Sequence, residues 1–150
     1  MHTNLAPADL GDLLERPILA VLATRRRDET TMLSPVWFEW DGEAVVLWVG
    51  SPEDGKARHV AADPRATVVI AESDLPYRGM EITGTAELTR DGYDEAVRRI
   101  SARYVGEERA DEFARSAPRG LLLRVTGRIR AWDFADDYPP DEDPSGRQAE

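Results

Sequence analysis

Cysteine is absent from this chain of 150 residues. Its absence excludes disulfides, thiolate metal sites, iron–sulfur clusters and cysteine nucleophiles. Histidine occurs only at His2 and His59, which is too little for a multi-histidine metal centre and makes a serine–histidine triad hard to build. No apolar run approaches the roughly 20 residues of a membrane span, and no signal peptide is visible. We therefore expect a cytoplasmic protein with no membrane contact and no metal site.

Lysine is equally scarce, because Lys56 stands alone beside eighteen arginines. Acids outnumber bases, and the formal net charge of −10 argues against binding to nucleic acid or to an anionic membrane. Residues 136–150 hold half of that excess, with six acids and one arginine. We expect them to form a disordered acidic tail, because so polar a segment cannot bury itself. Residues 1–135 are expected to form one domain.

Two glycine-rich nucleotide motifs are also missing, the Gly-x-Gly-x-x-Gly fingerprint and the phosphate loop that ends in Lys-Ser/Thr. A local anion site is instead expected at Gly55–His59, where a lysine, an arginine and a histidine follow closely. Ser51–Asp54 has the hydroxyl cap, the proline and the acids of a helix start, and the helix would end near Ala62. Those acids already interact with the positive end of the helix dipole. An anion should therefore lie beside the helix axis and depend on Lys56 and Arg58. The alternative is that these residues form a solvated helix face that binds no anion.

Apolar and alternating runs predict a mainly β protein with helices. Asp41-Gly42 separates Val36–Trp40 from Glu43–Val49, which predicts a hairpin with a type I′ turn. The other predicted strands are residues 18–24, 66–71, 81–88 and 120–134. Helices are predicted at residues 8–15, at 51–62, from Tyr93 to Tyr104 with Asp91 as its cap, and at 111–115. Hairpins that follow one another directly favour an antiparallel barrel over a doubly wound sheet.

Three aromatic residues, Trp37, Trp48 and Tyr77, would offer flat surfaces near the expected anion site. A flat aromatic surface beside a phosphate site suits a cofactor that carries a ring. The alternative is that these side chains belong to the barrel core and to a dimer interface, where aromatic residues are common.

Four motifs are spaced along the chain: Val21–Thr24, Leu33–Gly42, Lys56–Ala66 and Gly84–Leu88. Together they resemble the pyridoxamine 5′-phosphate oxidase-like split-barrel family, and most closely its branch that uses the deazaflavin coenzyme F-420. The resemblance implies a six-stranded antiparallel split β-barrel with peripheral helices. It also implies a homodimer with two cofactor sites at the subunit interface.

The same resemblance implies which residues contact the cofactor. The phosphate end is expected at four positions in and after the turn: Gly50, Ser51, Lys56 and Arg58. The ring is expected along the second strand, largely on backbone groups of Ser34, Pro35, Val36 and Trp37. A further contact to the ring or the tail is implied at Tyr77 and Arg78.

Two positions depart from the family pattern. His59 stands where relatives commonly have asparagine, and the first hairpin turn, Arg26–Thr30, lacks the usual Asp-Gly. Arg25–Arg27 would either meet the anionic oligoglutamate tail of the coenzyme or form a solvated hairpin tip.

The function implied by the resemblance is that of an oxidoreductase. It would transfer a hydride between reduced coenzyme F-420 and an unsaturated small-molecule substrate. No side chain is assigned as a catalytic acid or base, because the cofactor carries the chemistry. An FMN-dependent oxidase or reductase of the same fold is one alternative. A flavin- or haem-binding protein without turnover is another.

Overall fold

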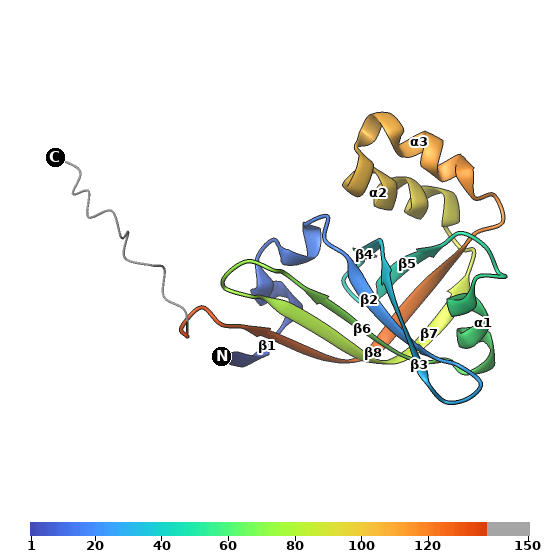
Figure 1. Ribbon diagram of the computed structural model, residues 1–150. Coiled ribbons are helices and arrows are strands. Elements are labelled where there is room, and N and C mark those ends of the chain that lie inside the picture. Colours follow the sequence, from blue (N-terminus) through green and yellow to red (C-terminus); the bar gives the residue numbers. More distant parts are fainter. Residues whose placement is uncertain (138–150) are drawn as a thin grey trace.

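Residues 1–137, the part of the chain that the structure describes, form one antiparallel sheet with helices around it in the computed structural model (Figure 1). The strands are β1 (His2–Leu5), β2 (Ala20–Arg25), β3 (Thr31–Val36), β4 (Phe38–Trp40), β5 (Val45–Val49), β6 (Arg65–Ala71), β7 (Gly79–Thr89) and β8 (Leu121–Asp133). The helices are α1 (Gly55–Ala62), α2 (Tyr93–Val105) and α3 (Glu107–Ser116), with short 3-10 turns at Pro7–Leu10 and Leu13–Glu15. No helix in this part is long and apolar enough to cross a membrane.

The sheet order is β3-β2-β6-β7-β8-β5-β4, and β1 pairs with β8. The mainly β split barrel with peripheral helices is therefore confirmed, but it has eight strands where six were expected. Two features account for the difference. The polar segment His2–Leu5 gains strand geometry only by pairing with β8. The run from Thr31 to Trp40 is divided at Trp37, so that β3 pairs with β2 while β4 pairs with β5.

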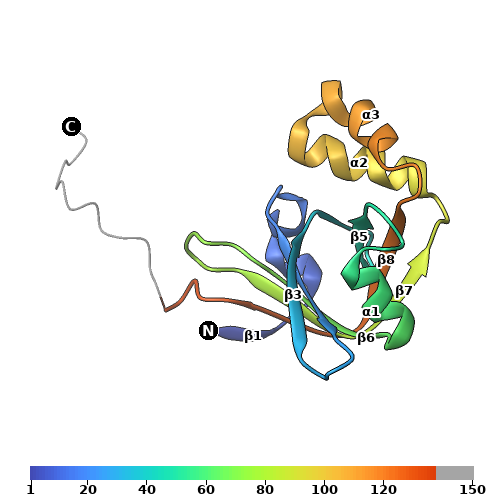
Figure 2. The ribbon, with the colours of Figure 1, turned by 45° about the vertical axis from the view of Figure 1, so that its right-hand side comes forward.

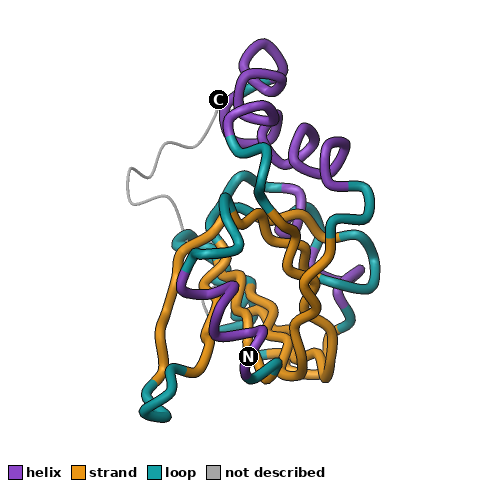
Figure 3. The backbone as a smooth tube through the Cα atoms, turned by 90° about the vertical axis from the view of Figure 1, so that its right-hand side faces the viewer, coloured by secondary structure: helices purple, strands orange, loops and turns teal. Residues whose placement is uncertain are grey.

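Side-chain alternation along the strands decides what fills the barrel. In β5, Val45, Leu47 and Val49 point into the main core, whereas Val46 and Trp48 pack outward against residues of α2. Figure 3 shows the strands surrounding this core. As predicted, Val36 and Phe38 share the inner face of the second run, and Trp37 and Glu39 share the outer one. The largest fully buried side chains are Phe38, Leu10, Leu13, Leu22 and Leu47.

The loop Asp41–Ala44 differs from the predicted type I′ turn, because Gly42 has a positive φ of 94° and Asp41 does not. Instead, the Asp41 carboxylate accepts the backbone N–H groups of Glu43 and Ala44, at 2.9 and 2.7 Å. The side chain thus closes a wider loop than the two-residue turn would.

Two predicted helix caps are also wrong. Asp54, not Ser51, caps α1, since its carboxylate accepts the Lys56 backbone N–H at 3.0 Å. Gly92, not Asp91, precedes α2, because the chain enters this helix in a left-handed conformation, φ 66°, that glycine adopts without strain. The predicted helix at residues 8–15 is broken into two turns by Gly11, and the one at residues 111–115 is longer, as α3.

Helices α2 and α3 lie against each other above one end of the barrel, and α1 lies beside the sheet near the β2–β3 turn (Figures 1 and 2). Phe113 of α3 reaches Trp37, and α1 carries Lys56, so two helices and the β3–β4 junction converge. The predicted acidic tail, residues 136–150, lies outside the described residues apart from Asp136 and Asp137.

Candidate cofactor-binding site

An aromatic cluster marks the junction between β3 and β4. The Trp37 ring stacks on Tyr104 of α2, with 4.8 Å between ring centroids and 3° between planes. Phe113 lies 5.5 Å and Trp48 lies 6.1 Å from Trp37, both tilted. A cavity of about 400 Å³ opens beside these rings. This ring pocket is lined by Pro35, Val36, Trp37, Trp48, Lys56, Phe113 and Ser116.

Hydrogen bonds fix the orientation of the cluster. The Trp48 indole N–H donates to the Tyr93 hydroxyl at 3.0 Å, and that hydroxyl donates to the carbonyl of Ala117 at 2.5 Å. The Tyr104 hydroxyl donates to the carbonyl of Ile18 at 2.6 Å. Burial raises the pKa of Tyr104, so this hydroxyl stays protonated and keeps donating. The rings are therefore held before any ligand arrives.

Lys56 reaches the ring pocket from the first turn of α1. Its ammonium donates to both carboxylate oxygens of Asp54, each at 2.9 Å, and only 17% of its side chain is exposed. The adjoining turn is also satisfied internally. The Ser51 hydroxyl donates to Glu53, and Arg119 pairs with the same carboxylate at 2.6 Å. These two donors lower the pKa of Glu53 to about 2. Because Asp54 already accepts hydrogen bonds from Lys56, an incoming anion must share this ammonium with Asp54.

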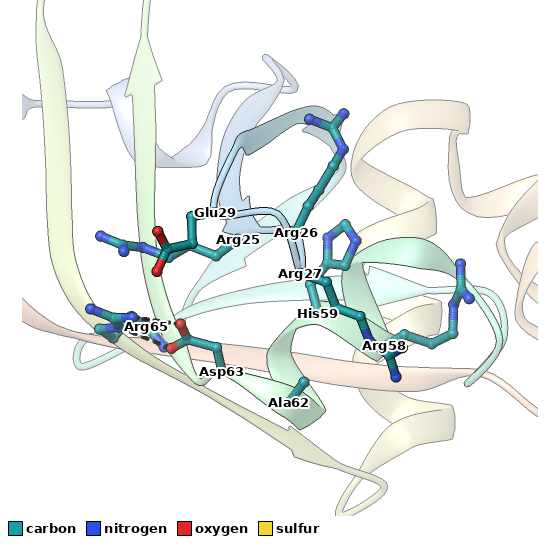
Figure 4. Close-up of a pocket in the computed structure, with 9 residues that line it drawn as sticks. All are labelled: Arg25, Arg26, Arg27, Glu29, Arg58, His59, Ala62, Asp63 and Arg65. Carbon is teal, nitrogen blue, oxygen red and sulfur yellow. Dashed lines mark hydrogen bonds and ion pairs between the residues drawn. The ribbon is translucent and has the colours of Figure 1, made fainter.

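A second, larger cavity lies between α1, the β2–β3 turn and the start of β6 (Figure 4). This arginine pocket has a volume of about 650 Å³. It is lined by Arg25, Arg26, Arg27, Glu29, Arg58, His59, Ala62, Asp63 and Arg65.

Three of its five arginines lack a hydrogen bond or a close ion pair. Arg65 is paired with Asp63 at 2.7 Å, which lowers the pKa of that carboxylate to about 2, and Arg26 donates to the carbonyl of Thr31 at 2.9 Å. Within residues 1–137, the side chains of Arg27 and Arg58 have no hydrogen-bond or ion-pair partner. Arg25 interacts with Asp63 only through longer-range electrostatic attraction. The pocket thus carries surplus positive charge.

The structure brings together four of the residues expected at the cofactor: Pro35, Val36, Trp37 and Lys56 all line the ring pocket. It places Arg58 apart from these four residues, in the arginine pocket. The reason is helical geometry, since residues two apart point to different faces of a helix.

The other expected phosphate and ring contacts lie near these pockets. Gly50 and Ser51 lie in the turn between β5 and α1, and Ser51 is engaged by Glu53. Ser34 lies in β3 just before the ring-lining residues. Contact of these three residues with a cofactor stays a prediction.

Tyr77 and Arg78 lie elsewhere, in the turn between β6 and β7 at the opposite end of the sheet from α1 (Figure 1). The Arg78 guanidinium donates to both oxygens of Glu72 at 2.8 Å, and to Asp12 and the carbonyl of Leu10 at 2.8 Å. Within this chain Arg78 is part of a structural ion-pair network. Its contact with a cofactor, and that of Tyr77, stays a prediction for the assembled dimer.

Sequence reasoning missed Phe113 and Ser116, which α3 contributes to the ring pocket. Only Phe113 had a usable signal, as the sole aromatic residue of an otherwise polar helix. It also missed the contact between Thr24 and His59, whose side chains meet at 3.0 Å. No local pattern indicates a contact between a strand and a helix 35 residues apart.

A split barrel with an aromatic ring pocket and adjoining cationic groups defines a class, the flavin-type oxidoreductase fold. Residues 7–133 match the family model of pyridoxamine 5′-phosphate oxidase, and the chain belongs to this family. No curated protein matches the chain.

Solved structures show the same fold. A conserved hypothetical protein from Mycobacterium tuberculosis has a TM-score of 0.78 and 23% identity, over 97% of this chain and 95% of its own. A protein named F420 reductase has a TM-score of 0.65 and 27% identity, over 79% of this chain and 93% of its own. A FAD-binding protein from Mesorhizobium loti has a TM-score of 0.63 and 16% identity, over 87% and 93%.

Proposed function

We propose that the protein is an oxidoreductase that transfers a hydride between reduced coenzyme F-420 and an unsaturated small-molecule substrate. The observation that carries this proposal is the arginine pocket, which is lined by α1 as the ring pocket is. FMN ends in one phosphate, whereas F-420 continues beyond its phosphate into an anionic oligoglutamate tail. Unpaired Arg27 and Arg58 supply positive charge where such a tail would continue. The 27% identity to the protein named F420 reductase supports the same choice.

The residues of the ring pocket fit a planar ring system. Trp37 and Trp48 offer aromatic faces, Pro35 and Val36 offer an apolar strand, and Lys56 provides a cation at one side. When bound, the coenzyme would supply the hydride. The chain's own residues would hold the ring flat, exclude water and neutralise the anionic end. The Lys56 ammonium would then donate to the phosphate as well as to Asp54.

A second copy of the chain would complete the two cofactor sites of a homodimer. Among the strands that the structure describes, β3 is at the end of the sheet and pairs only with β2, which leaves its other edge open. Leu33 of β3 is 66% exposed and Leu19 before β2 is 48% exposed. An open edge beside exposed apolar side chains favours association, and it lies next to Pro35 of the ring pocket.

Parallel titrations of the purified protein with F-420 and with FMN, at one pH and one salt concentration, test the proposal. The deazaflavin riboside that lacks phosphate and tail serves as a third ligand. We expect F-420 to bind most tightly and the riboside least. The double variant Arg27→Gln/Arg58→Gln should lose affinity for F-420 while its affinity for the riboside stays unchanged. Tighter binding of FMN than of F-420 would contradict the proposal, as would binding of neither.

A further inference from the structure

His59 is held in the arginine pocket by a buried hydroxyl. Thr24 of β2 is only 1% exposed, and its Oγ1 lies 3.0 Å from Nδ1 of His59. This contact fixes the imidazole and leaves Nε2, at the far side of the ring, without a partner within residues 1–137. His59 is itself a lining residue of the pocket. One imidazole nitrogen is thus anchored in the fold, and the other is available to a ligand.

The charges around this imidazole are mostly positive. From β2 and its turn, from α1 itself and from the start of β6, the charged neighbours are Arg25, Arg26, Arg27, Glu29, Arg58, Asp63 and Arg65. Met32 of β3 and Gly55 of α1, which lie on its remaining side, are uncharged. In Figure 4, Arg27 and Arg58 are on the same side of the pocket as His59, while Glu29, Asp63 and Arg65 are grouped on the other side.

This arrangement couples proton binding to anion binding. An anion that lies between Arg27, Arg58 and His59 favours the protonated imidazole, because it attracts the added positive charge. Protonation in turn gives the anion one more charged donor. Because linkage is reciprocal, an anion that favours the protonated ring must bind more tightly when the ring is protonated. Imidazole side chains change charge between about pH 5 and 8, so this coupling acts near neutral pH.

We propose that His59 is a binding residue for an oligocarboxylate anion in the arginine pocket, and that it makes the affinity of this pocket rise as the pH falls. Thr24 is its positioning residue. The inference deepens the proposed function and rests on it in one respect, namely that the anion is the tail of the coenzyme. Asparagine at this position would have no proton to gain in this range and would give a pocket without this pH dependence.

The test uses an N-acetylated tetraglutamate peptide, which has no free amine and whose carboxylates remain ionised above about pH 6, so that only the protein titrates. NMR titrations at pH 6 and pH 8 would follow the ring signals of His59 and give the affinity. We expect binding to be about tenfold tighter at pH 6, the value of roughly one charged hydrogen bond. At pH 7 the peptide should move the His59 signals toward those of protonated imidazole.

Three variants make the result specific. His59→Asn should keep the affinity measured at pH 8 and lose the gain at pH 6. Thr24→Val should retain only part of the gain, because the ring is no longer held. His2→Asn removes the other histidine of the chain, which pairs with Asp136, and should behave as the wild type. An unchanged pH dependence in His59→Asn would overturn the inference, and so would failure of the peptide to bind at either pH. A His59-dependent gain in a protein that prefers FMN would support this inference and contradict only the proposed function.

Discussion

Lys56 has a counter-charge within its own turn, and this limits what an anion gains from it. Its ammonium lies 2.9 Å from both oxygens of Asp54, whose carboxylate also caps α1. A phosphate at this site therefore replaces part of an existing ion pair. The affinity that Lys56 contributes is set by the difference between the two partners.

We expect Lys56→Ala to weaken cofactor binding by roughly 1.5–3 kcal/mol, the range for hydrogen bonds to charged groups, with the fold intact. Asp54→Asn is the matched variant. Asparagine still caps the helix but no longer neutralises Lys56, so the cofactor should bind more tightly. Fluorescence titration measures both affinities, and circular dichroism checks the fold. Equal affinity of the wild type and Lys56→Ala would remove Lys56 from the site.

Glu72 anchors the network at the other end of the sheet. Its side chain is 2% exposed and accepts from Arg78 at 2.8 Å and from Arg16 at 2.6 Å. The hydrogen bonds from Arg78 hold the pKa of Glu72 below its ordinary value of 4.5. A lowered pKa means that this stabilisation is fully present above pH 4.5 and is lost as the pH falls through the folded-state value.

Glu72→Gln should therefore reduce the free energy of unfolding at pH 7 by about 3 kcal/mol, because it removes the buried carboxylate that Arg16 and Arg78 share. The loss should shrink as the pH is lowered below 4.5, where the wild type loses the same interaction. Urea denaturation at pH 7 and pH 4 measures both. Glu53→Gln, at an exposed carboxylate, should change stability little. A Glu72→Gln variant as stable as the wild type at pH 7 would show that the network does not stabilise the fold.

At the scale of elements, β7 and β8 form the longest pairing of the sheet, and within it two glycines lie opposite each other. Gly84 lies opposite Gly127, and a Cβ on Gly84 would lie 2.0 Å from the carbonyl oxygen of Thr126. Glycine at position 84 thus has a steric cause, the close approach of a neighbouring backbone.

Gly84→Ala should reduce the free energy of unfolding by about 1–3 kcal/mol, as overpacking against a backbone usually does. Gly50→Ala is the control, since nothing lies within 4 Å of a Cβ placed there. Thermal unfolding of the two variants compares them directly. A Gly84→Ala protein as stable as Gly50→Ala would mean that β7 and β8 separate at this point without loss.

For the whole molecule, the open edge of β3 belongs both to the proposed dimer interface and to the surroundings of the proposed cofactor site. Leu33 and Pro35 are two residues apart on β3, so they point to the same face of the strand. A partner that covers Leu33 would therefore also close the space beside the ring pocket.

Leu33→Asp should convert the dimer to a monomer and weaken cofactor binding at the same time, because a buried unpaired carboxylate opposes association. Sedimentation velocity and fluorescence titration measure the two effects. Ile129→Asp is the matched control: Ile129 is 37% exposed on β8, which β2, β6 and β7 separate from β3 in the sheet. A wild-type protein that is monomeric at all concentrations, or a dimeric Leu33→Asp variant, would contradict this assembly.

The sequence alone determined most elements, because the signals for them are local. Alternation in Val36–Trp40 and Glu43–Val49 placed the right side chains inside, and the helical spacing from Tyr93 to Tyr104 identified α2. Pro35–Trp37 and Lys56 line one cavity, and their contact with a cofactor stays a prediction.

Only the tertiary structure decided how these pieces meet. It paired β1 with β8, brought Phe113 over Trp37 and turned Arg58 away from Lys56 into a second pocket. It also placed Thr24 against His59. Periodicity fixes which face of an element a side chain occupies, but the partner of that face comes from distant segments. That choice depends on packing and on the balance of buried charges, which no short stretch of sequence contains.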